Sequence, residues 1–317
     1  MQNTMGEANK LLRSSIHAFF QNYTSFISVA ALLLLPVSSS FLLSQAILTS
    51  SPSTLHFISS RLRSLFQASS FPSSSPLFPL LNLLLSQTLF SSIFTLPFTL
   101  TFLLLAKASV AQITPKNPFP PFSSILNLYP TLLTTHIFSS FILLSANSSI
   151  FVTLFLVFNI AELVGVSSDE SLLIISLIGV IIYSIVLANT VLICNLGLIV
   201  SAMENCSGYV PLLKACLLMR KRVATALSLA LPTNLAMALI EALFQYRVVR
   251  LYHVSKKLNM AIVCEGFLVA YMHSVVMVVE IIVSCLFYKR CRLSSGEDWE
   301  EGFGYRIEME PEDKEEV

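Results

Sequence analysis

The chain has 317 residues, of which 55% are hydrophobic and only 12% are charged, and its formal net charge is +1. A water-soluble domain carries about 25% charged residues, so this chain has too few charges to cover a water-facing surface. Together with a mean hydropathy of +0.76, the composition excludes an ordinary soluble protein and favours the lipid bilayer as the solvent.

The hydropathy pattern predicts an all-α, polytopic membrane protein with about six transmembrane helices and short interfacial amphipathic helices. The first apolar run, Thr24–Thr49, is longer than the apolar region of about 7–15 residues in a signal peptide, so we expect a retained span with a kink at Pro36. A cytoplasmic segment, residues 1–23, precedes a six-helix membrane domain over 24–288. The expected spans are residues 24–49, 77–106, 131–164, 171–202, 223–244 and 259–287.

Two of the connections and the third span have distinctive residue patterns. Helical spacing of apolar residues over Leu55–Phe66 predicts a short interfacial helix, and four prolines in Lys107–Phe122 predict a loop. The third apolar run, Tyr129–Val164, would reach roughly 50 Å as a helix, against a hydrocarbon core of about 30 Å. Either one long tilted helix begins outside the membrane, or the helix breaks near Ala146–Ser149. We favour the single helix.

The basic residues near the ends of the spans predict the orientation, because such residues prefer the cytoplasmic side. With both termini cytoplasmic, eleven bases lie on the cytoplasmic side and six on the other. The basic loop Gln245–Leu258 opposes this assignment, since it places four bases outside. Either the other basic residues determine the orientation despite this loop, or the fifth segment does not fully cross the membrane. The expected location is an endomembrane, such as the endoplasmic reticulum, or the plasma membrane.

Polar groups inside the spans are the first candidates for function, because a charged group in hydrocarbon is costly. In the sixth span, Glu265, His273 and Glu280 recur at spacings that keep them on one side of a helix. We predict an intramembrane polar network that either satisfies itself in the interior or lines a solute path. No lysine or arginine is expected deep in a span to pair with the acids, which weakens the case for an ion-coupled relay. The network comprises Asn195, Asn234, Glu241, Glu265, His273 and Glu280.

The connector after the fourth span predicts a turn and a basic amphipathic helix. Gly208 permits the turn, and Pro211 suits the first turn of the new helix. Basic residues toward water would bind anionic lipid headgroups. The residues expected to face lipid are Leu212, Leu213, Cys216, Leu217 and Met219. The candidate interfacial connector comprises Glu204, Gly208, Lys214, Arg220, Lys221 and Arg222.

The same stretch carries a family resemblance. The pattern consists of Asn195, Leu196, Val200, Ser201, Glu204, Gly208 and Lys214. A second match runs from Leu11-Leu12-Arg13-Ser14-Ser15 to Phe26 and Pro36. The chain resembles a family of uncharacterised six-span plant membrane proteins, which is similar to the membrane domain attached to some bacterial glycerophosphodiester phosphodiesterases. The chain departs from the family's Lys-Gly pattern at Lys221-Arg222. The resemblance implies a fold and a membrane location, and no activity.

No motif for catalysis or for a cofactor occurs in the chain. The six cysteines and five histidines show neither zinc-like spacing nor a Cys-x-x-Cys pair. We therefore expect no enzyme, catalytic residues, cofactor or metal site. We expect a membrane scaffold, assembly or lipid-interacting protein; the alternative is a small-solute or ion transporter that uses Glu241 and Glu280.

The charge distribution also suggests where partners would bind. From Glu297 to Val317, ten acids and two bases give an acidic cytoplasmic tail of net charge −8, part of the segment 289–317, and leave +9 on the rest of the chain. Aromatic residues interleave with these acids, which is compatible with a protein-binding segment. The expected partners are the bilayer, anionic headgroups at the connector and a protein at the tail, with no nucleic acid.

Overall fold

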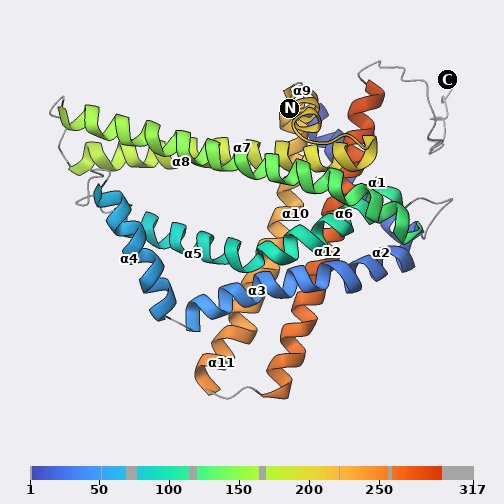
Figure 1. Ribbon diagram of the computed structural model, residues 1–317, viewed down its shortest axis with the longest axis horizontal. Coiled ribbons are helices and arrows are strands. Elements are labelled where there is room, and N and C mark those ends of the chain that lie inside the picture. The colour runs from blue at the N-terminus through green and yellow to red at the C-terminus, as the bar shows by residue number, and fades with distance from the viewer. Residues whose placement is uncertain are drawn as a thin grey trace.

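The computed structural model describes residues 2–50, 52–68, 77–113, 120–163, 169–220, 222–255 and 259–294. Helices and short connections account for all of these residues, and none of them lies in a strand (Figure 1). The predicted all-α class is therefore confirmed.

The N-terminal half contains six α-helices and two π-helical turns. In chain order they are α1 (Gln2–Gln21), α2 (Tyr23–Val29), the π-helical turn η1 (Ala30–Leu34), α3 (Leu35–Ser50), α4 (Pro52–Ala68), α5 (Leu77–Phe98), the π-helical turn η2 (Thr99–Leu103) and α6 (Leu104–Gln112). The predicted interfacial helix corresponds to α4.

The C-terminal half contains the longest helices of the molecule. They are α7 (Phe122–Leu163), α8 (Asp169–Glu204), α9 (Val210–Arg220), α10 (Val223–Phe244), the π-helical turn η3 (Gln245–Val249), α11 (Arg250–Ser255) and α12 (Met260–Ser294).

Six helical segments among the described residues are long and apolar enough to cross a membrane. They are Tyr23–Ile47, Leu85–Gln112, Phe122–Leu154, Leu177–Glu204, Val223–Tyr252 and Met260–Leu293. A segment of about 20 apolar residues spans a bilayer as a helix, so these six define an integral, multi-pass membrane protein.

A π-helical turn lies close to a proline in each of the first two spans. The turn η1 ends two residues before Pro36, and η2 begins two residues after Pro97. Proline removes a backbone donor, and a local π-helical turn is one way in which a membrane helix accommodates that loss. The expected irregularity near Pro36 is thus a widened turn inside an otherwise continuous helical segment.

The N-terminal segment is a helix that packs on the membrane domain. Helix α1 contacts both α10 and α12, and its Leu11 and Phe19 side chains are buried in the largest apolar cluster together with Phe26 of α2. The sequence predicted only a mixed, modestly basic segment here. Burial of these side chains provides the packing energy that a single amphipathic helix lacks in water.

Two predicted loops are wrong in their boundaries. The segment predicted as a loop from Lys107 begins instead as part of α6, which continues to Gln112 because its residues pack in the interior. The basic loop predicted from Gln245 is helical to Ser255, because Val249 of η3 packs into an apolar cluster with α3 and α12.

Helix α7 settles the alternatives for the third apolar run. It is one continuous helix of 42 residues, so the favoured single helix is confirmed. At the position where a break was considered, the Tyr183 hydroxyl of α8 donates to the Asn147 side-chain oxygen at 3.1 Å. The two helices form a long antiparallel hairpin (Figure 1), and little of its apolar surface is buried.

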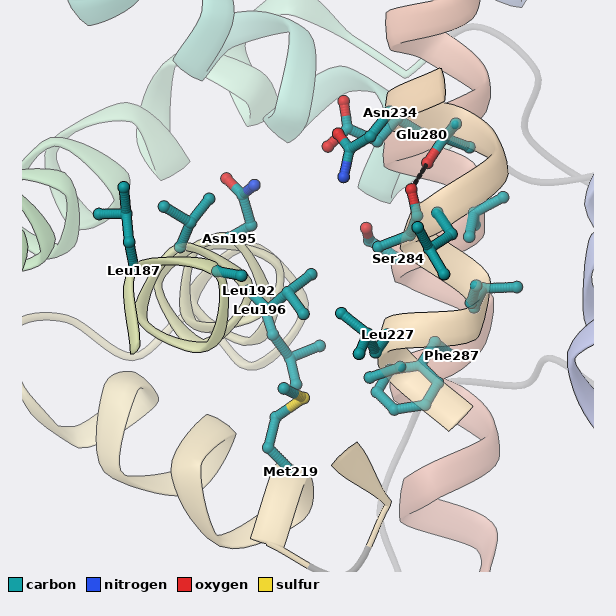
Figure 2. Close-up of a pocket in the computed structure, with 18 of the residues that line it drawn as sticks. Leu187, Leu192, Asn195, Leu196, Met219, Leu227, Asn234, Glu280, Ser284 and Phe287 are labelled. Carbon is teal, nitrogen blue, oxygen red and sulfur yellow. Dashed lines mark hydrogen bonds between the residues drawn. The ribbon is translucent and has the colours of Figure 1, made fainter. Parts of the chain in front are cut away.

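The long helices cross steeply and do not all run side by side. In Figure 1, α10 and α12 run across the direction of α7 and α8. Figure 2 shows the same relation, since it looks along α8 while α10 and α12 cross the view. Helices that cross steeply touch over a short length and then diverge. Helices α8 and α10 consequently make few contacts with each other.

Candidate functional site

A cavity lies where α8 diverges from α10 and α12. Its volume is about 480 Å³, and residues of α8, α10 and α12 line it together with Met219 of α9 (Figure 2). Small-molecule sites in proteins have volumes of about 300–1,000 Å³. The cavity is therefore large enough to hold a ligand, and its lining determines which kind.

One end of the cavity is polar. Figure 2 shows Asn195 of α8, Asn234 of α10 and Glu280 of α12 around this end, and Ser284 lies one helical turn after Glu280. These four side chains provide amide, hydroxyl and carboxyl groups. A carboxyl group and amides inside a membrane protein are costly unless they bind one another or a ligand.

The opposite end is apolar. Leu196, Leu227 and Phe287 line it together with the Met219 side chain (Figure 2). Small residues on α10 keep this part of the cavity open, since Ala226 and Ala230 occupy adjacent turns of that helix. The cavity is amphipathic, because the end around Asn195, Asn234 and Glu280 is more polar than the end around Met219 and Phe287.

A buried lysine forms a hydrogen bond with one of the polar residues of the cavity. Lys107 of α6 is only 6% exposed, and its Nζ donates a hydrogen bond to the Asn195 side-chain oxygen at 3.2 Å. The prediction that no lysine lies deep in a span is wrong, because α6 carries Lys107 into the interior.

The sequence did contain a signal for this lysine. Residues 108–113, Ala-Ser-Val-Ala-Gln-Ile, are still largely apolar, so the helical pattern continues past Lys107.

Because the Asn195 side-chain oxygen accepts from Lys107, the amide nitrogen of Asn195 is directed elsewhere. Figure 2 shows it on the side of Asn195 that faces α10 and α12, where it can donate to a ligand.

Glu241 lies outside this cavity, in a hydrogen-bonded chain of side chains. The Gln45 amide nitrogen of α3 donates to Glu241 at 3.2 Å, and the Gln245 amide nitrogen donates to the Gln45 oxygen at 3.1 Å. The structure thus separates Glu241 from Glu280, with which the sequence had grouped it.

The remaining polar residues of α12 face other neighbours. His273 is buried, and its Nδ1 atom lies 3.0 Å from the Ser38 hydroxyl while its ring stacks on Phe41. Glu265 is partly exposed and lies 3.8 Å from the Arg247 guanidinium. The predicted stripe exists along α12, but different elements pack on it at different heights. His273 contacts α3, Glu265 lies near Arg247 of η3, and Glu280 lines the cavity.

The connector is built as an ordered turn. Glu204 accepts a hydrogen bond from the Tyr288 hydroxyl of α12 and forms an ion pair with Lys214 at 2.5 Å. Gly208 has a φ of +79°, and its N–H donates to the Thr135 hydroxyl of α7 at 3.2 Å. The predicted turn at Gly208 is confirmed, because a positive φ of this kind favours glycine.

The lipid-facing residues of α9 were predicted only in part. Leu213, Cys216 and Leu217 are exposed, but Leu212 and Met219 are 3% exposed and point inward. The reason is the close approach of α9 to α8 at Gly197, where an added Cβ atom would lie 2.7 Å from the Leu212 side chain.

The basic residues at the end of α9 have different environments. Arg220 is exposed and Arg222 is half-buried, whereas Lys221 lies outside the described residues.

The helices and the cavity define a multi-pass membrane protein with an amphipathic cavity between α8, α10 and α12. The chain matches the family described as Domain of unknown function (DUF8558) over residues 4–300, and it belongs to that family. No curated protein and no solved structure matches it. The resemblance to the plant six-span family and to the membrane domain of bacterial phosphodiesterases stays a prediction.

Proposed function

We propose that this protein is a lipid-interacting membrane protein that holds a lipid molecule between α8, α10 and α12. The observation that carries the proposal is the amphipathic lining of the cavity. Asn195, Asn234 and Glu280 lie at one end, and Met219, Leu196, Leu227 and Phe287 lie at the other. A lipid has the same division between a polar headgroup and an apolar chain.

The position of the cavity supports entry from the bilayer. Val191 of α8 and both Leu227 and Leu231 of α10 line the cavity, and their exposed fractions are 39%, 42% and 62%. In a membrane span, such exposed apolar side chains face lipid. A lipid could therefore pass between α8 and α10 without crossing water.

Native mass spectrometry of the full chain released from lipid nanodiscs tests this proposal. The wild-type protein is expected to retain a lipid, and Ala230→Trp is expected to lose it because the indole fills the cavity. Ala238→Trp is the matched control, since Ala238 lies on the same helix, is exposed and does not line the cavity. Equal lipid retention by all three proteins would contradict the proposal.

We further propose a cytoplasmic position for both termini. The start of α1, helix α9 and the end of α12 lie at one end of the molecule, while η3 and α11 lie at the other (Figure 1). This arrangement supports a common side for the two termini and the opposite side for the basic segment around Arg247. At the cytoplasmic side, Arg220 and its basic neighbours would bind anionic headgroups, and the acidic tail would bind a protein partner.

A second candidate function, transport of a small solute or ion, is favoured by two ionisable side chains near the polar end. Lys107 and Glu280 are charged groups inside the membrane domain beside a cavity, and such groups often mark transport paths. Glu241, the other acid invoked, contacts Gln45 and does not line the cavity. If the protein transports a solute, Glu280→Gln in reconstituted vesicles should abolish the flux.

A further inference from the structure

We propose that the cavity selects an uncharged lipid with a free hydroxyl group, of the diacylglycerol class, over an anionic phospholipid with the same chains. This inference rests on the proposed function and adds the chemistry of the headgroup. It follows from the charges and hydrogen-bonding groups that face the polar end of the cavity.

The groups that face this end are mostly neutral. Among the residues that line the cavity, Glu280 is the single charged one. Asn195, Asn234 and Ser284 supply neutral donors and acceptors beside it. A hydroxyl group both donates and accepts, so it can donate to the Glu280 carboxyl group while it accepts from an asparagine amide.

An anionic phosphate would be disfavoured at the same place. It would face the Glu280 carboxyl group, and no cationic side chain lines the cavity to pair with it, so the phosphate would lose water without gaining an opposite charge. Lys107 does not line the cavity, and its ammonium group donates to the Asn195 side-chain oxygen. The lysine therefore cannot meet the phosphate directly.

A cationic headgroup is also a poorer fit than a hydroxyl. Lys107 already places a positive charge beside this end through its hydrogen bond to Asn195, so a second cation would add like charge there. Uncompensated charge away from water is costly. The hydroxyl adds no charge, and one acyl chain can lie along Leu196, Leu227 and Phe287 toward the opening between α8 and α10.

Photolabelling tests the selection directly. Diacylglycerol and phosphatidic acid with identical chains, each carrying a diazirine in one chain, would be added in turn to the full-length protein in phosphatidylcholine nanodiscs. Labelled peptides from α8 and α10 would be quantified by mass spectrometry. We expect at least about fivefold more cavity labelling by diacylglycerol, which corresponds to about 1 kcal/mol. Ala230→Trp should remove the labelling, and Ala238→Trp should retain it.

The outcomes separate this inference from the proposed function. Equal or stronger cavity labelling by phosphatidic acid would overturn the headgroup selection and leave lipid binding intact. Absence of cavity labelling by either lipid in the wild-type protein would overturn both. A Glu280→Gln protein that remains monodisperse should bring the two lipids closer to equal labelling, since the carboxyl group that the phosphate would face is then removed.

Discussion

Replacement of Lys107 by methionine should destabilise the protein strongly, because the change keeps the length of the side chain and removes a buried charge. Lys107 is 6% exposed and donates to Asn195 at 3.2 Å. A hydrogen bond to a charged group contributes about 1.5–3 kcal/mol, and the loss of Lys107 leaves the Asn195 side-chain oxygen without this donor. We therefore expect Lys107→Met to lower the free energy of unfolding by about 2 kcal/mol.

The double variant distinguishes coupling between Lys107 and Glu280 from a general loss of packing. In Lys107→Met/Glu280→Gln both ionisable groups are replaced by neutral ones, so any coupling between the two side chains is removed together with both of them. The double variant should be more stable than the sum of the two single effects predicts, by at least about 1 kcal/mol.

Equilibrium unfolding in mixed detergent micelles would measure both effects. Lys214→Met is the matched control, because Lys214 forms its ion pair at the surface with a side chain that is 47% exposed, and such pairs contribute about 0–1 kcal/mol. A Lys107→Met protein as stable as this control would refute the reasoning, and so would strictly additive effects in the double variant.

Two further predictions concern helix α9. Gly197→Ala should lower the free energy of unfolding by about 1–3 kcal/mol. The new methyl group on α8 would overlap the Leu212 side chain of α9, which would have to move. Gly266→Ala is the control measured in the same assay, since its Cβ would meet neighbours only at ordinary distances of 3.7 Å or more, and it should be neutral or slightly stabilising. If the exposed face of α9 lies on the membrane, a fluorophore on Cys216 in a variant without the other cysteines should be quenched by spin-labelled lipid more than by iodide. Stronger quenching by iodide would place that face in water.

The sequence was sufficient for the features that depend on local chemistry. Long apolar runs predicted six spanning helices, and the structure contains six. Gly208 and Pro211 predicted the turn and the start of α9, because a positive φ and the first turn of a helix have strong residue preferences. The continuity of α7 followed from the weakness of any breaking signal near Asn147, where a hydrogen bond to α8 joins the two helices.

The composition of the site could not be predicted from the sequence, because it depends on how the helices cross. Spacing along α12 correctly grouped His273 and Glu280 on one side of the helix. It does not indicate that His273 contacts α3 and that Glu280 lines a cavity. Lys107 was missed because the prolines that follow it were read as the start of a loop. A boundary error of a few residues, which is usual in such predictions, therefore placed the buried lysine that binds Asn195 in a loop.

Electron cryomicroscopy of the full chain in lipid nanodiscs, with a rigid antibody fragment bound to enlarge the particle, tests the central claim most directly. The account predicts lipid density between α8, α10 and α12, with its polar end against Asn195 and Glu280 and its chain beside Phe287. A map in which α8 packs against α10 and closes the cavity, or in which the cavity holds only water, would contradict it.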